Sequence, residues 1–475
     1  MSVAYNQMNS TQSNQNLRTT GVFLGICLFL MSIAASKLPV GLIDKVLLIT
    51  FLGAIASWLV IGKQPTWYSP SNIMLAGYLT LGFLHPWVRN GVDGYTSGQL
   101  GWMISTNLVQ ASLILNCGVF AYAIGYTVRK SLSSDEVAIQ ANQTVFMEIP
   151  KVIEIALWLF WLMCMLILLK TFGISVLTNS RSGTNVSALE GGSSYLYYSS
   201  YLLLVPAISN LLKPVSIRPK YWTWVLFISS QLLALISGSR IVLLPGLLTL
   251  MIALIIRRGK NISRSLLIVT VIAGLILLVG MRLWRESHDT YKVKEGRNSV
   301  SYMLEDVFSG QDTAMLDNLA VLVAAREFGV VQHPMPFTPY ISAITAPIPR
   351  ELWHGKPISV DQELNAKILP TQYQVGYGFS FTVFGEAIYC AGFLGMLFVA
   401  FLLGYFSNYL YQSLLRFPGS KIGIVAIALI PQTLVVLRGS ITADFPRFAM
   451  IAAPAILLTV IKSDSDQNSF AKHLV

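Results

Sequence analysis

Arginine side chains recur in this sequence next to the ends of hydrophobic runs, in stretches such as "SGSR" and "LRGS". A guanidinium group binds two phosphate oxygens at once, and each charge-assisted hydrogen bond of this kind contributes roughly 1.5–3 kcal/mol. Several of them together predict a site that holds a pyrophosphate. The strongest candidates for these contacts are Arg240, Arg350 and Arg438, and the secondary candidates are Arg285, Lys356 and Arg447.

Each of these cations also has a simpler explanation, because a long basic side chain near the end of a membrane span extends toward the lipid headgroups. The set as a whole fits this explanation less well. Its members are all predicted at one membrane face, which the positive-inside rule disfavours, and arginine outnumbers lysine among them. A shared anionic partner would explain both features.

Composition places these residues in a membrane protein. Of the 475 residues, 54% are hydrophobic and 12% are charged, whereas soluble domains have about 25% charged residues. Apolar runs of roughly 17–25 residues are long enough to cross a bilayer as helices. The predicted fold is therefore an all-α, polytopic membrane protein with about 12 transmembrane helices, near 20–36, 46–62, 71–88, 103–127, 152–169, 195–212, 222–238, 241–256, 265–283, 383–411, 422–437 and 447–461.

The basic residues predict how the chain is oriented. The short loops on one side of these runs hold half as many Lys and Arg residues as the segments on the other, which places both termini in the cytoplasm. The expected organisation is a disordered cytoplasmic tail at 1–19, nine spans within 20–283, a large outer (periplasmic) loop at 284–382, three spans within 383–461 and a cytoplasmic tail at 462–475.

The outer loop is expected to carry amphipathic helices at the membrane surface. Apolar residues recur at helical spacing between Leu304 and Val323, and Ser309 or Asp312 would cap a helix that ends near Gly329. A second short helix is expected in "PFTPYISAITAPIPR", where the last two prolines end the helix and stiffen the backbone before Arg350.

Two other classes of site are disfavoured. The net charge of +11 is explained by basic loops that face anionic lipid, so nucleic acid is not an expected partner. The four cysteines are isolated inside predicted spans, which argues against a disulfide framework and against a zinc site.

The order of several motifs resembles that of one protein family. "SGSR" closes a short hairpin between two predicted spans, "PIPRELWHGKP" lies in the outer loop, "GFSFTVFGEAIYCAGFLG" enters the next span, and "LRGS" precedes the last one. Over about residues 181 to 450, this order resembles the Wzy-type oligosaccharide repeat-unit polymerases, integral membrane enzymes of bacterial O-antigen, capsule and exopolysaccharide assembly. The most specific part is "PR-x-LW-x-x-KP" followed downstream by a Gly-Glu pair.

The resemblance implies a glycosyltransferase-type polymerase on the outer face of the bacterial cytoplasmic membrane. Such an enzyme would move a growing glycan from one undecaprenyl pyrophosphate carrier onto the sugar of another carrier-linked repeat unit. The implied partners are this undecaprenyl-pyrophosphate-linked oligosaccharide, the lipid bilayer, a chain-length regulator and a flippase. The arginines would stabilise charge on the departing pyrophosphate, so neither a metal nor another cofactor is expected.

The same transfer needs a base that removes the proton from the acceptor hydroxyl. Glu386 is the first candidate, because partial burial at the outer end of a span raises the pKa of a carboxyl group. His354 titrates near neutrality and is the second, and Asp444 is the third. Each has a structural alternative, since Glu386 and Asp444 could pair with arginines and His354 could be a solvated loop residue. Asp444 has Arg447 as its expected partner.

A group of tyrosines offers possible sugar contacts. Tyr195, Tyr197, Tyr198 and Tyr201 follow a Gly/Ser-rich outer loop and could stack on sugar rings. Interfacial tyrosines are common in membrane proteins, so the pattern is also explained by position alone.

Three other functions compete with a polymerase. An O-antigen ligase-type glycan transferase would share the carrier and the chemistry and differ in the acceptor. A lipid-linked oligosaccharide flippase or transporter fits the span count, but transporters of this size usually have two similar halves, and here the outer loop divides the spans nine to three. An acyltransferase would need a histidine in or near the membrane, for which only His85 is suitably placed.

Overall fold

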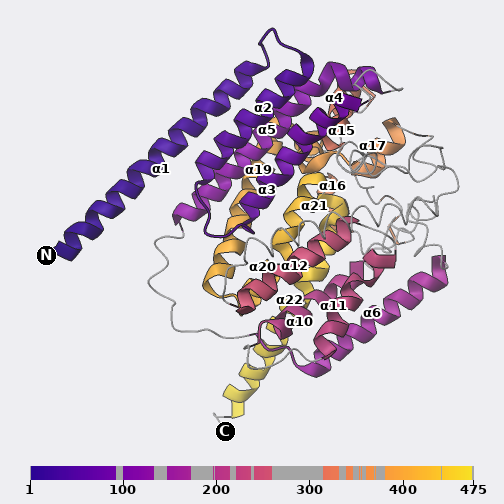
Figure 1. The fold of residues 1–475 in the computed structure, drawn as a ribbon. Helices are drawn as coiled ribbons and strands as arrows, with labels where there is room; N and C mark the ends of the chain where they lie inside the picture. The colour runs from indigo at the N-terminus through magenta and orange to yellow at the C-terminus, as the bar shows by residue number, and fades with distance from the viewer. Residues whose placement is uncertain are drawn as a thin grey trace.

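The fold was described from a computed structural model, in which every regular element of the described residues is a helix (Figure 1). The described residues are 2–92, 100–132, 147–172, 196, 198–213, 221–236, 240–258, 314–330, 338–345, 352–353, 355, 360–368, 370, 380–439 and 441–472. The helices are α1 (Ser2–Ala35), α2 (Leu42–Ile61), α3 (Pro70–Leu79), the π-helix η1 (Thr80–Leu84), α4 (His85–Val92), α5 (Gly101–Leu132), α6 (Lys151–Phe172), the 3₁₀ helix η3 (Ser199–Leu203), α10 (Leu204–Leu211), α11 (Tyr221–Ile236), α12 (Arg240–Arg258), α15 (Met315–Glu327), α16 (Thr338–Ile344), α17 (Val360–Ile368), α19 (Thr382–Arg416), α20 (Lys421–Leu429), the 3₁₀ helix η4 (Ile430–Gln432), α21 (Thr433–Arg438) and α22 (Ile441–Lys472).

Five helical segments of the described chain are long and apolar enough to cross a membrane. They are Leu42–Ile61, Gly101–Ser131, Lys151–Thr171, Thr382–Arg416 and Lys421–Arg438, the last of which runs through α20, η4 and α21. The other predicted runs within the described residues also coincide with helix, and 265–283 lies outside them. The all-helical fold is thus confirmed, and the total of twelve spans stays a prediction.

The helices form two groups, which contact each other through α19, α20 and α21 (Figure 1). In the first group α1 packs on α2, α2 on α5, and α5 on both α15 and α19. In the second group α10 packs on α11, α12, α20 and α22, while η3 contacts α6, α11 and α22. The short helix α21 contacts α3 and α19 from the first group and α12 and α22 from the second.

The contact between α5 and α19 depends on two glycines. A Cβ atom on Gly125 would overlap the carbonyl oxygen of Phe401, and one on Gly404 would overlap the carbonyl oxygen of Tyr122. Membrane helices associate closely where small residues let their backbones approach, because lipid provides little hydrophobic force between them. Asn408 adds a buried hydrogen bond of 2.6 Å from its Nδ2 to the carbonyl oxygen of Tyr126.

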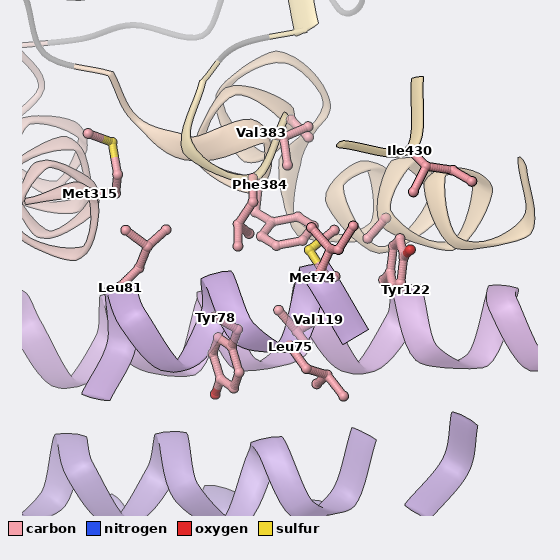
Figure 2. Packing of buried hydrophobic residues seen from close by; sticks show 14 of the residues in the cluster. Met74, Leu75, Tyr78, Leu81, Val119, Tyr122, Met315, Val383, Phe384 and Ile430 are labelled. Carbon is pink, nitrogen blue, oxygen red and sulfur yellow. The ribbon is translucent and has the colours of Figure 1, made fainter. Parts of the chain in front are cut away.

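A continuous apolar core lies between α5 and the start of α19. Figure 2 shows side chains from α3, η1, α5, α15, α19 and η4 meeting there. Phe384 of α19 occupies the space that a side chain at Gly118 of α5 would need. The residue two positions after Phe384 is Glu386, so this packing fixes the first turn of α19 directly beside a charged group.

The helix α15 differs from the expected amphipathic surface helix. Its residues from Met315 to Ala325 are all buried, chiefly against α5, so the prediction of an amphipathic helix with an exposed face is wrong here. Ala314 is its N-cap, so neither Ser309 nor Asp312 caps it. The predicted end is confirmed, because Gly329 has a φ of 68° and its N–H bonds to the carbonyl oxygen of Arg326, as glycine does after many helices.

The second helix expected in the outer loop is present as α16, Thr338–Ile344. Ile341 and Ile344 are exposed, whereas Ala343 is buried, and α16 packs on α22. The helix therefore has one covered side and one apolar open side, as the expected interfacial helix would. The helix α17 was not anticipated.

Replacing Gly404 with alanine should destabilise the protein, because the new methyl group would push α19 away from α5. Overpacking of this kind typically costs about 1–3 kcal/mol. Thermal unfolding of the purified protein in detergent would measure the change. Gly21→Ala is the matched control, since a Cβ there would stand an ordinary 3.4 Å from the Leu59 carbonyl oxygen. Equal melting temperatures for both variants would contradict the close approach of the two backbones.

Candidate functional site

The structure describes four of the predicted site residues with their side chains, namely Glu386, Arg438, Asp444 and Arg447. All four lie around the connection between α21 and α22. Arg240 is described as the first residue of α12, without its side chain. Arg285, Arg350, His354 and Lys356 lie outside the described residues, so their predicted roles stay predictions.

The connection between α21 and α22 is held at both ends by the segment that starts α19. The hydroxyl of Ser380 donates a hydrogen bond of 2.9 Å to the carbonyl oxygen of Arg438. The backbone N–H of Ile441 donates one of 2.5 Å to Oε2 of Glu386, which is fully buried. We call these two bonds the turn clamp. The clamp satisfies a carbonyl at the end of α21 and an N–H at the start of α22, both of which lack partners within their own helix.

Gly439 lies within the clamped turn and leaves no room for a side chain. A Cβ atom there would lie 2.5 Å from Oδ2 of Asp444 and 2.9 Å from the carbonyl oxygen of Val435. The glycine of "LRGS" therefore permits the carboxylate of Asp444 to approach the end of α21.

The segment that provides the turn clamp, residues 380–386, has a strained backbone. Thr382 has a φ of 64°, although it is a β-branched residue and fully buried. Such residues adopt this conformation rarely, at a cost of roughly 1–3 kcal/mol. The Oγ1 atom of Thr382 accepts a hydrogen bond of 3.1 Å from the N–H of Gly385, which closes the first turn of α19. The strain thus lies between the two residues of the turn clamp, Ser380 and Glu386.

A buried ion pair begins α22. Nη2 of Arg447 lies 3.2 Å from Oδ1 of Asp444, and the two residues are 3% and 6% exposed. The guanidinium carbon of Arg447 also lies 5.0 Å from the ring centre of Tyr198 and 5.6 Å from that of Tyr201. Both distances fit cation–π contacts. Asp444 is therefore the ion-pair partner of Arg447, which is one of the two roles considered for it from the sequence.

The guanidinium of Arg447 retains hydrogen-bonding capacity. Within the described part of the chain, its Nε and Nη1 atoms are buried and have no hydrogen-bond partner. Its Nη2 donates a hydrogen bond of 3.4 Å to the hydroxyl of Tyr198. Buried donors without partners are costly in a native protein, which makes them candidates for contact with a ligand.

Electrostatic effects link the described charges to one another. Burial raises the pKa of the Asp444 carboxyl above its ordinary value, and the positive charges of Arg447 and Arg438 oppose this rise. Burial also raises the pKa of the Tyr340 hydroxyl in α16, and the negative charge of Glu386 raises it further. Arg438, Asp444 and Arg447 therefore form one electrostatic group, and α16 brings Tyr340 close to Glu386.

Two of the four tyrosines after the Gly/Ser-rich loop contact a residue of the candidate site, and the predicted sugar stacking stays a prediction. Tyr198 and Tyr201 lie against Arg447, while Tyr195 and Tyr197 lie outside the described residues. Reasoning from sequence also missed Ser380, because a lone serine in "GFSFT" carries no signal of its bond to a residue 58 positions away. In the part of the chain that is described, no three His, Cys, Asp or Glu side chains are gathered as metal ligands would be.

Asp444→Ala should lower the free energy of unfolding by about 3–5 kcal/mol, because it leaves the charge of Arg447 buried and unpaired. The double variant Asp444→Ala/Arg447→Ala should lose less than the sum of the two single variants. Unfolding in detergent would measure these values. Lys367→Ala, which breaks an exposed pair with Glu363, is the control and should change stability by about 1 kcal/mol or less. Additive losses at Asp444 and Arg447 would refute the coupling.

Comparison with known proteins identifies the family of this chain. No match was found among curated proteins or among solved structures. The family model described as "O-antigen polysaccharide polymerase Wzy" matches residues 19–465, which include every helix that contributes to the site. The chain therefore belongs to the Wzy family of O-antigen polysaccharide polymerases.

Proposed function

We propose that this protein joins undecaprenyl-pyrophosphate-linked oligosaccharide repeat units into a longer glycan, on the outer face of the cytoplasmic membrane. Family membership supports the polymerase role. The observation that carries the finer proposal is the guanidinium of Arg447, which is buried beside Arg438 with two nitrogen atoms that lack partners among the described residues.

A pyrophosphate oxygen suits this guanidinium for a physical reason. An arginine buried among membrane helices is costly, and Asp444 balances only its charge. The Nε and Nη1 donors still lack acceptors in the described structure. Phosphate oxygens accept hydrogen bonds in the planar geometry that a guanidinium offers, so a bound pyrophosphate would satisfy those donors and receive positive charge at the same time.

The proposed reaction exchanges one bond for another at the anomeric carbon of the donor sugar. The hydroxyl oxygen of the acceptor sugar forms a new bond to this carbon, and the bond from the carbon to the pyrophosphate oxygen breaks with its electron pair. The leaving group is undecaprenyl pyrophosphate, and the hydroxyl proton passes to a base. Arg438 and Arg447 would stabilise the negative charge that develops on the leaving group.

Glu386 is our proposed base among the described residues. Asp444 is occupied by its ion pair with Arg447, which assigns this carboxylate to holding the arginine. Glu386 is fully buried at the start of α19, beside the same turn that carries Arg438. Its backbone hydrogen bond fixes the orientation of the carboxylate, and a fixed orientation is what proton transfer requires. His354 is the alternative base.

The long loop would complete the site from the outer face. Arg350 and Lys356 follow α16 in the sequence, and α16 places Tyr340 near Glu386. We propose that the proline-rich segment around Arg350 adds further cations to the pyrophosphate site, together with Arg240 and Arg285. A flippase that delivers the substrate and a regulator of chain length are the partners that this arrangement would need.

Cells that lack this gene should make single repeat units and no longer glycans, and the wild-type gene should restore the ladder of chain lengths on a gel. Arg447→Lys at equal membrane abundance should shorten or abolish the ladder, because lysine keeps the charge but loses the planar pair of donors. Arg350→Ala should fail in the same way if the outer loop contributes to the site.

Arg326→Ala is the matched control, since this arginine lies on α15 with an exposed side chain. It should restore the full ladder. If the deletion strain makes no capped single unit, the block lies at ligation, flipping or an earlier step, and the polymerase proposal is refuted. A full ladder with Arg447→Lys would refute the proposed contact between this guanidinium and pyrophosphate, but not the polymerase role of the family.

A further inference from the structure

Two uncharged residues connect the candidate site to α15. Nδ2 of Asn318 donates a hydrogen bond of 3.0 Å to the carbonyl oxygen of Ser380. The hydroxyl of Ser380 in turn donates to the carbonyl oxygen of Arg438 at 2.9 Å. A series of two hydrogen bonds thus runs from α15, through the segment before α19, to the backbone of an arginine in the site.

We infer that Asn318 and Ser380 are positioning residues for Arg438, and that α15 is the fixed element from which they act. This inference rests on the proposed function, in which the guanidinium of Arg438 contacts pyrophosphate. Neither residue would touch the substrate. Their effect on binding would pass through the backbone of Arg438.

The helix α15 is suited to serve as a fixed element. Eleven consecutive residues, Met315 to Ala325, are buried, and Leu319 and Leu322 pack beside Gly385 at the start of α19. Asp317, which is 2% exposed, forms an ion pair with Arg89 and a hydrogen bond of 3.0 Å with Nε2 of the fully buried His85. These partners come from α4, so the first turn of α15 is bonded to α4 immediately beside Asn318.

Arg438 needs such support because of its place in the chain. It is the last residue of α21, which has only six residues, and its carbonyl has no acceptor role left within that helix. Ser380 supplies the missing donor. Loss of this hydrogen bond would remove one constraint on the end of α21 and let the turn shift. A displacement of about 1 Å in a positioning element can reduce catalysis by about a hundredfold.

A double-mutant cycle on ligand binding would test this role. The full-length protein is purified in detergent, and its dissociation constant for undecaprenyl pyrophosphate is measured for the wild type, Ser380→Ala, Arg438→Ala and the double variant. Loss of one charge-assisted contact predicts that Arg438→Ala weakens binding by about tenfold or more. Ser380→Ala should weaken it by roughly three- to tenfold, which corresponds to the loss of one ordinary hydrogen bond.

The decisive result is the double variant. If Ser380 acts through Arg438, removing Ser380 should have no further effect once the guanidinium is absent, so the double variant should bind as Arg438→Ala does. Ser380→Thr keeps the hydroxyl and should restore most of the affinity. Ser413→Ala removes a serine hydroxyl of α19 that bonds to the Tyr409 carbonyl oxygen within its own helix, and should bind like the wild type.

The possible outcomes separate the two proposals. If Arg438→Ala weakens binding but Ser380→Ala does not, or if their effects multiply in the double variant, the positioning role is refuted and the proposed function stands. If Arg438→Ala binds like the wild type, both the pyrophosphate contact and the positioning role that rests on it are refuted. Should Ser380→Ala not yield folded protein by its melting curve, Asn318→Ala enters the same cycle with the same expected pattern.

Discussion

The candidate site depends on how the turn between α21 and α22 satisfies its backbone. Inside a membrane protein, a carbonyl or N–H outside helical hydrogen bonding needs another partner, because lipid offers none. Here Ser380 bonds to the carbonyl of Arg438, and Glu386 accepts from the N–H of Ile441. The break between the helices is possible because the start of α19 provides both groups. The same break brings Arg438 and the ion pair of α22 together.

The second constraint is that Arg447 is buried. The described contacts satisfy only part of its guanidinium group. Asp444 balances its charge, and the faces of Tyr198 and Tyr201 add cation–π attraction. These contacts balance the charge of the guanidinium and provide partners for its Nη2 atom. They leave Nε and Nη1 without acceptors among the described residues. A site that is balanced in charge but short of acceptors fits an anionic ligand with several oxygens better than it fits a structural ion pair alone.

The sequence predicted most of the described helices and the pair of Asp444 and Arg447, but not the residues that surround this pair. Apolar runs identify helices because their length and composition are local properties. The pair of Asp444 and Arg447 is also local, since residues three apart share a helix face. The burial of α15 is not local. Its charged residue Asp317 bonds to His85, 232 positions earlier, and no pattern within the helix indicates this partner.

The burial of α15 changes how the outer loop relates to the chemistry. A loop lying over the membrane surface would act as a cover whose sequence could vary independently of the site. Here α15 is inserted against α5 and α19, Asn318 holds the clamping segment, and α16 places Tyr340 beside the charge of Glu386. Elements from the loop and from the membrane helices thus fix the same few charged groups. Changes in α15 or α16 would therefore alter the geometry of these charged groups, so these two helices and the final helices must fit each other.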